Sequence, residues 1–209
     1  MKRPTTLFML LIVASVLLFF MLNLLLGSVA IPLKSVWHIL MHTNDEPQVW
    51  QNIILKSRVP QSLTALVAGA GLAISGLQMQ TVFRNPLAGP SVLGISSGAS
   101  LGVAFVVLLS GSLGGVALSK LSYVGEIALS VAAIAGALSI MALIVYVSQK
   151  VKGNVTLLII GVMIGYVANA IIGVLKYFSV EEDIRAYVIW GLGSFSRVSG
   201  DQVILFDVP

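Results

Sequence analysis

Long stretches without a charged residue dominate this chain of 209 residues. Cutting the sequence at every Asp, Glu, Lys and Arg leaves five uncharged runs, each longer than the ~20 residues that a helix needs to cross a bilayer. These runs cover residues 4–33, 59–83, 85–119, 127–149 and 153–175. Because they are continuously apolar and do not alternate over about ten residues, they predict membrane-spanning helices and not the strands of a barrel.

The composition agrees with a membrane protein. Hydrophobic residues make up 57% of the chain and charged residues 10%, and the mean hydropathy is +1.01, far outside the range of soluble globular domains. We therefore predict an all-α integral membrane protein, a polytopic helical bundle with five transmembrane helices and the start of a sixth in the apolar residues 202–206. The bilayer is its expected surrounding, with no nucleic acid and no cofactor, and the absence of cysteine excludes thiolate metal sites.

The first apolar run is expected to stay in the protein as a helix. Its 30 uncharged residues exceed the apolar region of a secretory signal peptide, and no clear cleavage site follows it. Lys2 and Arg3 then predict a cytoplasmic N-terminus, and the acid-free turn with Lys150 and Lys152 falls on the same side. The total number of Lys and Arg residues on each side does not favour this orientation, because it places seven on the outer side of the membrane and five on the cytoplasmic side.

Two connections on the opposite side are predicted to contain short interfacial helices, at residues 36–43 and 186–196. In the first, His38 and His42 are four residues apart and share a helical face. We favour interfacial polar positions over a metal pair, because a zinc or iron site normally needs three or more ligands.

A polar turn separates the second and third apolar runs. Arg84, Asn85 and Pro86 interrupt helical geometry there, since proline disfavours helical backbone in the preceding residue and asparagine tolerates turns. Gln78 and Gln80 precede the turn. Polar side chains at such depth indicate either a hydrogen bond between helices or the lining of a pathway, and both readings stay open.

Glycines recur at helical spacing in the third and fifth runs. Small residues four apart allow helix backbones to approach closely, so we predict that the two helices pack around a common axis. Close packing alone would explain the pattern. The glycines concerned are Gly94, Gly98 and Gly102 in the third run and Gly161 and Gly165 in the fifth.

With these residues in view, the chain resembles the FecCD-type permease subunits of ATP-driven importers for iron-siderophores, haem and cobalamin. Four segments carry the resemblance in the same order along the chain. The family's Arg-x-Pro-Arg is similar to residues 58–61, its Gly-x-x-x-Gln-x-x-x-Arg-Asn-Pro-Leu-Ala-x-Pro to 76–90, its Leu-Gly-Ile-Ser-Ser-Gly-Ala to 93–99 and its Trp-x-x-Gly-Ser to 190–194.

The resemblance implies a multi-pass protein of the cytoplasmic (inner) membrane that does no chemistry itself. It implies a transport pathway on a homodimer axis, an extracytoplasmic substrate-binding protein and cytoplasmic ATPase subunits. It also implies two constrictions at the inner end of the pathway. The first is an inner gate formed by Asn85, Pro86 and Leu87, and the second is formed by Gly153, Asn154, Val155 and Thr156.

Outer basic residues of the family dock the binding protein, which assigns that role to Arg58. Gln61 stands where a second arginine is usual, and Lys56 is the expected substitute. The chain also resembles only the first half of a ten-helix permease, so residues 1–209 are expected to form one C-terminally truncated transmembrane domain. From this chain alone we expect no ATP-coupled transport, and the alternative is a transport-incompetent half-permease or a structural remnant. An intramembrane enzyme finds little support, because Glu126 is a lone acid near a helix end.

Overall fold

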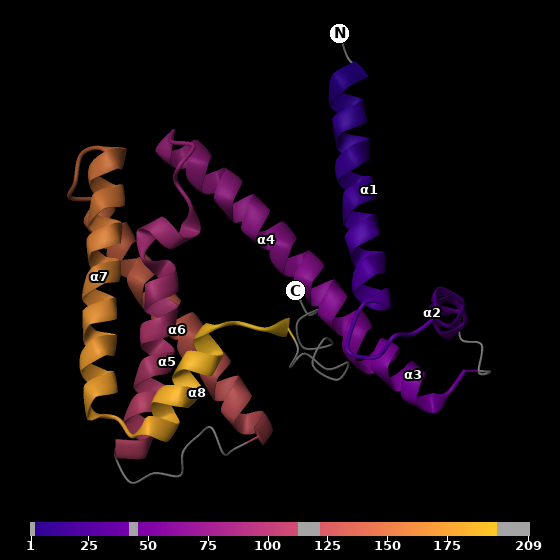
Figure 1. The fold of residues 1–209 in the computed structure, drawn as a ribbon. Helices are drawn as coiled ribbons and strands as arrows, with labels where there is room; N and C mark the ends of the chain where they lie inside the picture. The colour runs from indigo at the N-terminus through magenta and orange to yellow at the C-terminus, as the bar shows by residue number, and fades with distance from the viewer. Residues whose placement is uncertain (1–2, 42–45, 113–121, 196–209) are drawn as a thin grey trace. The chain divides into compact units, whose positions relative to one another are not determined.

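The computed structural model describes residues 3–41, 46–112 and 122–195, and throughout these ranges the regular structure is helical (Figure 1). The described residues form two compact units. One unit ends at Gly71 and the other comprises Leu72–Gly193, so that each contains part of one long helix, α4 (Val59–Phe83).

The first unit consists of α1 (Arg3–Leu25), α2 (Leu33–Leu40), α3 (Gln48–Ile53), a π-helical turn η1 (Ile54–Arg58) and the beginning of α4. Its core joins residues from the end of α1, the following loop, α2 and η1: Leu24, Ile31, Val36, Ile39 and Ile54. The short amphipathic helix predicted at 36–43 is present as α2. It buries Val36 and Ile39, while Trp37 is exposed.

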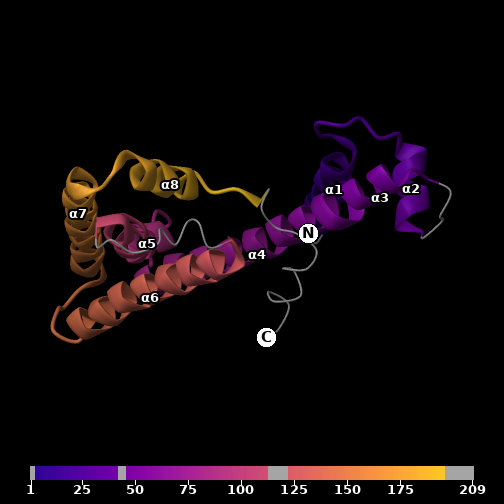
Figure 2. The same ribbon diagram turned by 90° about the horizontal axis from the view of Figure 1, so that it is seen from below.

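The second unit consists of the rest of α4, a 3₁₀ turn η2 (Pro90–Leu93), α5 (Ile95–Ser112), α6 (Ser122–Ser148), α7 (Asn154–Phe178) and α8 (Glu181–Gly191). Helix α5 is its centre, because it packs against α6, α7 and α8 (Figure 2). The core around α5 is built from Val103, Ala104, Val107, Leu108, Ile172 and Tyr187. Helix α8 has 11 residues, which is too short to span a bilayer.

The predicted all-α membrane class is confirmed. In the described part of the chain, four helical stretches are long and apolar enough to cross a membrane, Thr6–Leu25, Gln48–Phe83, Gly125–Ser148 and Asn154–Phe178. Ile95–Leu109 of α5 is a shorter apolar helix, because a turn and η2 occupy the first residues of the uncharged run 85–119. The sixth span expected from residues 202–206 lies outside the described residues.

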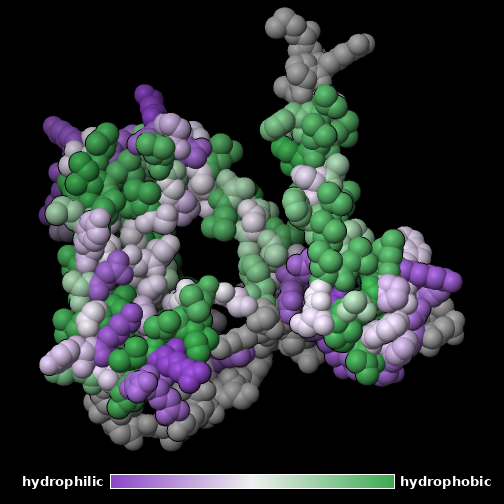
Figure 3. Space-filling view, in the orientation of Figure 1, coloured by the Kyte–Doolittle hydropathy of each residue, from purple (hydrophilic) through white to green (hydrophobic). Residues whose placement is uncertain are grey.

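The surfaces of the helices suit a lipid solvent. Large apolar side chains such as Leu7, Phe8 and Phe19 of α1 are exposed. Their exposure costs free energy in water, but not in the hydrocarbon of a bilayer. Figure 3 shows hydrophobic residues over α1, and hydrophilic residues mixed with hydrophobic ones around α2 and α3 and at α8. The short helices therefore have the mixed surfaces expected at an interface between lipid and water.

The predicted glycine stripe of the third helix needs correction. Gly94 is not part of α5, because it ends η2 in the left-handed region at φ 73°. A Cβ atom there would lie 2.8 Å from the Gly161 carbonyl oxygen and 3.1 Å from the Gly165 nitrogen. Gly94 is thus required both by its backbone conformation and by close contact with α7.

Gly98 and Gly102 face a different helix. A Cβ atom on Gly98 would lie 2.7 Å from the carbonyl oxygen of Gly136 in α6, and one on Gly102 would overlap the Ala132 carbonyl oxygen. The three predicted glycines therefore divide between α7 and α6. Gly136 was missed from the sequence, although Ala132 and Gly136 are four apart and form the same small-residue spacing.

Candidate functional site

The turn after α4 is held in shape by its own polar groups. Helix α4 ends at Phe83, and Arg84 takes a left-handed conformation at φ 49°, which is uncommon outside glycine. The Asn85 side-chain oxygen accepts a hydrogen bond of 2.9 Å from the Leu87 backbone N–H, and the Gln80 side-chain amide donates to the Pro86 carbonyl at 3.2 Å. These bonds pre-order the turn.

The turn is anchored at both ends and free at its tip. Phe83 and Ala88 are buried in a cluster with Leu93, Ile144 of α6 and Leu158 of α7. Between them Leu87 is 84% exposed, and Pro86 is also exposed. The arrangement presents an exposed apolar side chain on a loop that its own hydrogen bonds hold in shape.

The structure brings the two predicted constrictions together. The Asn154 side-chain amide donates a hydrogen bond of 3.1 Å to the carbonyl of Val82, 72 residues earlier in the chain. Val82 is in the last turn of α4, where helix carbonyls lack partners within their own helix. Gly153, at φ 110°, precedes α7, and Val155 and Thr156 are exposed on its first turn.

The two glutamines before the turn are both exposed. Gln80 donates its side-chain hydrogen bond to the Pro86 carbonyl of the following turn and not to another helix. Gln78 lies two residues away, so it points to another side of α4. Lining of a pathway by Gln78 and Gln80 stays a prediction.

At the other end of α4, the structure gives Arg58 a role within the chain. Its side chain is buried, with 6% of the residue exposed. The guanidinium donates hydrogen bonds to the carbonyls of Leu24 at 2.6 Å, Leu25 at 3.2 Å and Val29 at 2.5 Å. Arg58 therefore caps the C-terminus of α1, where carbonyls and a positive charge attract each other. The expected docking role of Arg58 conflicts with this burial.

Two neighbours of Arg58 complete this region. A Cβ atom on Gly27 would lie 2.6 Å from a terminal nitrogen of the guanidinium, so this glycine leaves space for the charged group. Lys56, in the same π-helical turn, is exposed. Lys56 is thus the basic residue of the pair that a partner protein can reach.

A second polar corner joins α7 to α8. The Ser179 hydroxyl donates to the carbonyls of Leu175 at 2.6 Å and of Leu108 at 3.0 Å, which ties the corner to α5. The Lys176 ammonium lies 4.8 Å from the centroid of the Tyr187 ring, within the range of a cation–π contact. Burial raises the pKa of the Tyr187 hydroxyl above its ordinary value of 10.0, and a hydrogen bond with Ser100 lowers it in part. These contacts hold α8 against α5.

The described residues contain no group of three or more His, Cys, Asp or Glu side chains that could hold a metal ion. His38 lies 3.3 Å from a carboxylate oxygen of Glu46, and His42 lies outside the described residues. The described groups around the turn are apolar side chains, the amides of Gln80, Asn85 and Asn154, and the exposed guanidinium of Arg84.

Comparisons with known proteins agree on one group. The model of the FecCD transport family matches residues 14–208. The chain is 35% identical to the hemin transport system permease protein HmuU of Yersinia pestis over 182 residues, which are 86% of this chain and 51% of that protein. It is also 35% identical to the vitamin B12 import system permease protein BtuC of Pectobacterium atrosepticum, over 73% of this chain and 44% of that protein.

A solved structure shows the same fold. The chain aligns over 99% of its length with 59% of a metal-chelate type ABC transporter in an inward-facing conformation, with a TM-score of 0.74 and 28% sequence identity. The chain thus spans about half the length of the curated relatives it matches and a somewhat larger part of this structure.

Proposed function

Because this chain belongs to the FecCD transport family, we propose that it forms membrane-spanning structure of an ATP-driven importer that moves iron-siderophore, haem or cobalamin-type chelates across the cytoplasmic membrane. The relatives named as hemin and vitamin B12 permeases support this range of substrates. The observation that carries the proposal is the braced turn with its exposed Leu87, joined to the start of α7.

In this proposal the turn is the inner gate. Asn85 and Gln80 fix the backbone, Pro86 stiffens it, and Leu87 supplies the apolar side chain that closes the passage. An apolar constriction suits this purpose because it excludes ions and water without binding the cargo. Gly153 and the first residues of α7, 154–156, form the second constriction beside it.

The proposed partners lie on both faces of the membrane. The N-terminus and the α6–α7 connection face the cytoplasm, where ATPase subunits act. A substrate-binding protein docks on the opposite face, with Lys56 as a contact for its acidic residues, and steering by such charges raises association rates more than affinity. The pathway lies on the axis of a homodimer.

A transport assay tests the function. The permease is purified from its own membrane with every chain that accompanies it and reconstituted in liposomes with its ATPase and binding protein. Uptake of hemin, cobalamin and a ferric siderophore is then measured with and without ATP. We expect ATP-dependent uptake of one class. Uptake of none of the three would contradict the proposed function and favour a membrane protein without transport activity.

Matched variants test the gate in the same liposomes. We expect Leu87→Ala to raise ATP-independent leakage of a small solute several-fold, because the shorter side chain no longer fills the constriction. Leu72→Ala makes the same change at an exposed position of α4 and serves as the control. Equal leakage in the two variants would remove Leu87 from the gate.

A further inference from the structure

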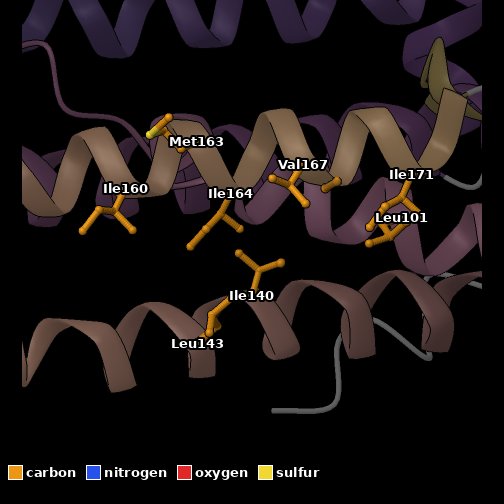
Figure 4. A pocket seen from close by; sticks show the side chains of 9 residues that line it. Leu101, Ile140, Leu143, Ile160, Met163, Ile164, Val167 and Ile171 are labelled. Carbon is orange, nitrogen blue, oxygen red and sulfur yellow. The ribbon is translucent and has the colours of Figure 1, made fainter.

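An open apolar cavity of about 300 Å³ lies beside α6 and α7 in the second unit. Figure 4 shows side chains of α7 facing those of α6 across it. The α7 side is lined by Ile160, Ile164, Val167 and Ile171, and the α6 side by Ile140 and Leu143. All the lining residues are apolar, so water gains no hydrogen-bond partner from their side chains.

The cavity is a groove that runs along α7. Ile160 and Ile171 are eleven residues apart on this helix, which is about 16 Å along its axis. Several residues that line the groove are exposed, among them Leu143, Met163 and Val167, so it opens to the surroundings of the protein. An extended hydrocarbon chain lying in the groove would cover apolar side chains over this length.

Positive charge stands at one end of this cavity. Ile140, Leu143 and Lys150 follow each other at spacings of three and seven, which places them along one side of α6 and its extension. The Lys150 ammonium lies 4.8 Å from the centroid of the Tyr146 ring, one turn beyond Leu143. Lys152 follows in the connection to α7, and both lysines are exposed.

The sequence around these lysines lacks compensating acids. No Asp or Glu occurs between Glu126 and Glu181, a stretch that includes most of α6, the connection and all of α7. Leu143 and Lys150 are seven residues apart, about 10 Å along the axis. A chain lying in the cavity would therefore have its end near two cations, in the region where a bilayer has its headgroups.

We propose that this end of the second unit is a binding site for one anionic phospholipid. One acyl chain occupies the cavity between α6 and α7, and the headgroup phosphate binds Lys150 and Lys152. A negatively charged lipid is favoured over a zwitterionic one because surface lysines attract anionic headgroups. The site adjoins the second predicted constriction, since Lys152 is followed directly by Gly153, but binding of a lipid to it can be measured without transport.

Delipidated protein in detergent provides the test. Phosphatidylglycerol and phosphatidylcholine with identical acyl chains are titrated, and retention is measured by native mass spectrometry and by the shift in unfolding temperature. We expect phosphatidylglycerol to bind at least fivefold more tightly. The double variant Lys150→Gln, Lys152→Gln should abolish this difference, whereas Lys34→Gln, which removes an exposed lysine of the first unit, should leave it unchanged.

A second variant tests the acyl chain independently. Leu143 is 43% exposed, so Leu143→Trp can fill the side of the cavity without disturbing a buried core, and it should weaken binding of both lipids. The proposal is overturned if the two lipids bind equally to the unmodified protein, or if the lysine variant behaves like Lys34→Gln. It is also overturned if Leu143→Trp leaves binding intact, or if the assembled transporter retains no lipid because a protein segment fills the cavity.

Discussion

Gly102 and Gly136 leave no room for a methyl group between α5 and α6. A Cβ on Gly136 would overlap the Gly98 carbonyl oxygen, and one on Gly102 would overlap that of Ala132. Backbone atoms cannot rotate away as a side chain can, so the helices themselves would have to separate. We expect Gly102→Ala and Gly136→Ala each to lower the free energy of unfolding by about 1–3 kcal/mol, measured by denaturation in detergent.

Gly173 is the matched control for these two glycines. It lies within α7, and nothing approaches within 4 Å of the position that its Cβ would take. Gly173→Ala should be neutral or stabilising by up to about 1 kcal/mol, because alanine favours helix. If all three variants unfold alike, the contact between α5 and α6 is looser than the structure indicates.

Variants of Arg58 and Lys56 distinguish a structural role, which we assign to Arg58, from contact with the binding protein, which we assign to Lys56. Replacing Arg58 by leucine leaves the carbonyls of Leu24, Leu25 and Val29 without their donor. Since hydrogen bonds to a charged group contribute about 1.5–3 kcal/mol each, we expect a loss of at least about 2 kcal/mol in unfolding free energy. Lys56→Gln should leave stability unchanged and weaken attachment of the binding protein, measured by surface binding at low and high salt.

The opposite pattern would reverse these assignments. Unchanged stability in Arg58→Leu, together with a large loss of binding, would mean that the guanidinium reaches the partner and does not cap α1.

Among the elements, the end of α4 and the start of α7 act as one piece in this structure. The Asn154 to Val82 hydrogen bond and the buried Phe83 and Leu158 hold them together. The chain contains no cysteine, so spin labels can be attached at Leu87→Cys and Thr156→Cys alone. We expect a narrow distribution of distances between the labels, which broadens when Asn154→Ala removes the donor.

Ser139→Ala is the control for this experiment. Its hydroxyl donates only to the Ala135 carbonyl of its own helix, so the distribution should stay narrow. A distribution of distances that is already broad with Asn154 in place would show that the two predicted constrictions move independently.

For the whole molecule, the proposed orientation can be tested by labelling. Single cysteines replace the exposed residues Lys34 and Lys152. Spheroplasts with an intact inner membrane are then treated with a membrane-impermeant maleimide. Lys34→Cys should react at once, and Lys152→Cys only after the membrane is permeabilised. The reverse result would place the N-terminus outside and exchange the proposed gate and docking faces.

Much of the fold follows from local chemistry along the chain. The apolar runs specify helices because a backbone in hydrocarbon must satisfy its own hydrogen bonds, and the break at Arg84, Asn85 and Pro86 follows from proline and turn geometry. The short amphipathic helix α2 was also predictable from its periodicity, although it begins three residues before the expected position. Even Gly136 carried a signal in its spacing from Ala132.

The sequence by itself determined that this protein lies in a lipid bilayer, which helices it forms and to which family it belongs. Each of these depends on the identity and order of residues along the chain. Only the tertiary structure decided which helix each glycine contacts, that Arg58 is buried on α1, and that Asn154 reaches Val82. These outcomes join residues that are far apart in the chain. Side-chain spacing on a single helix defines a face, but not the partner that covers that face.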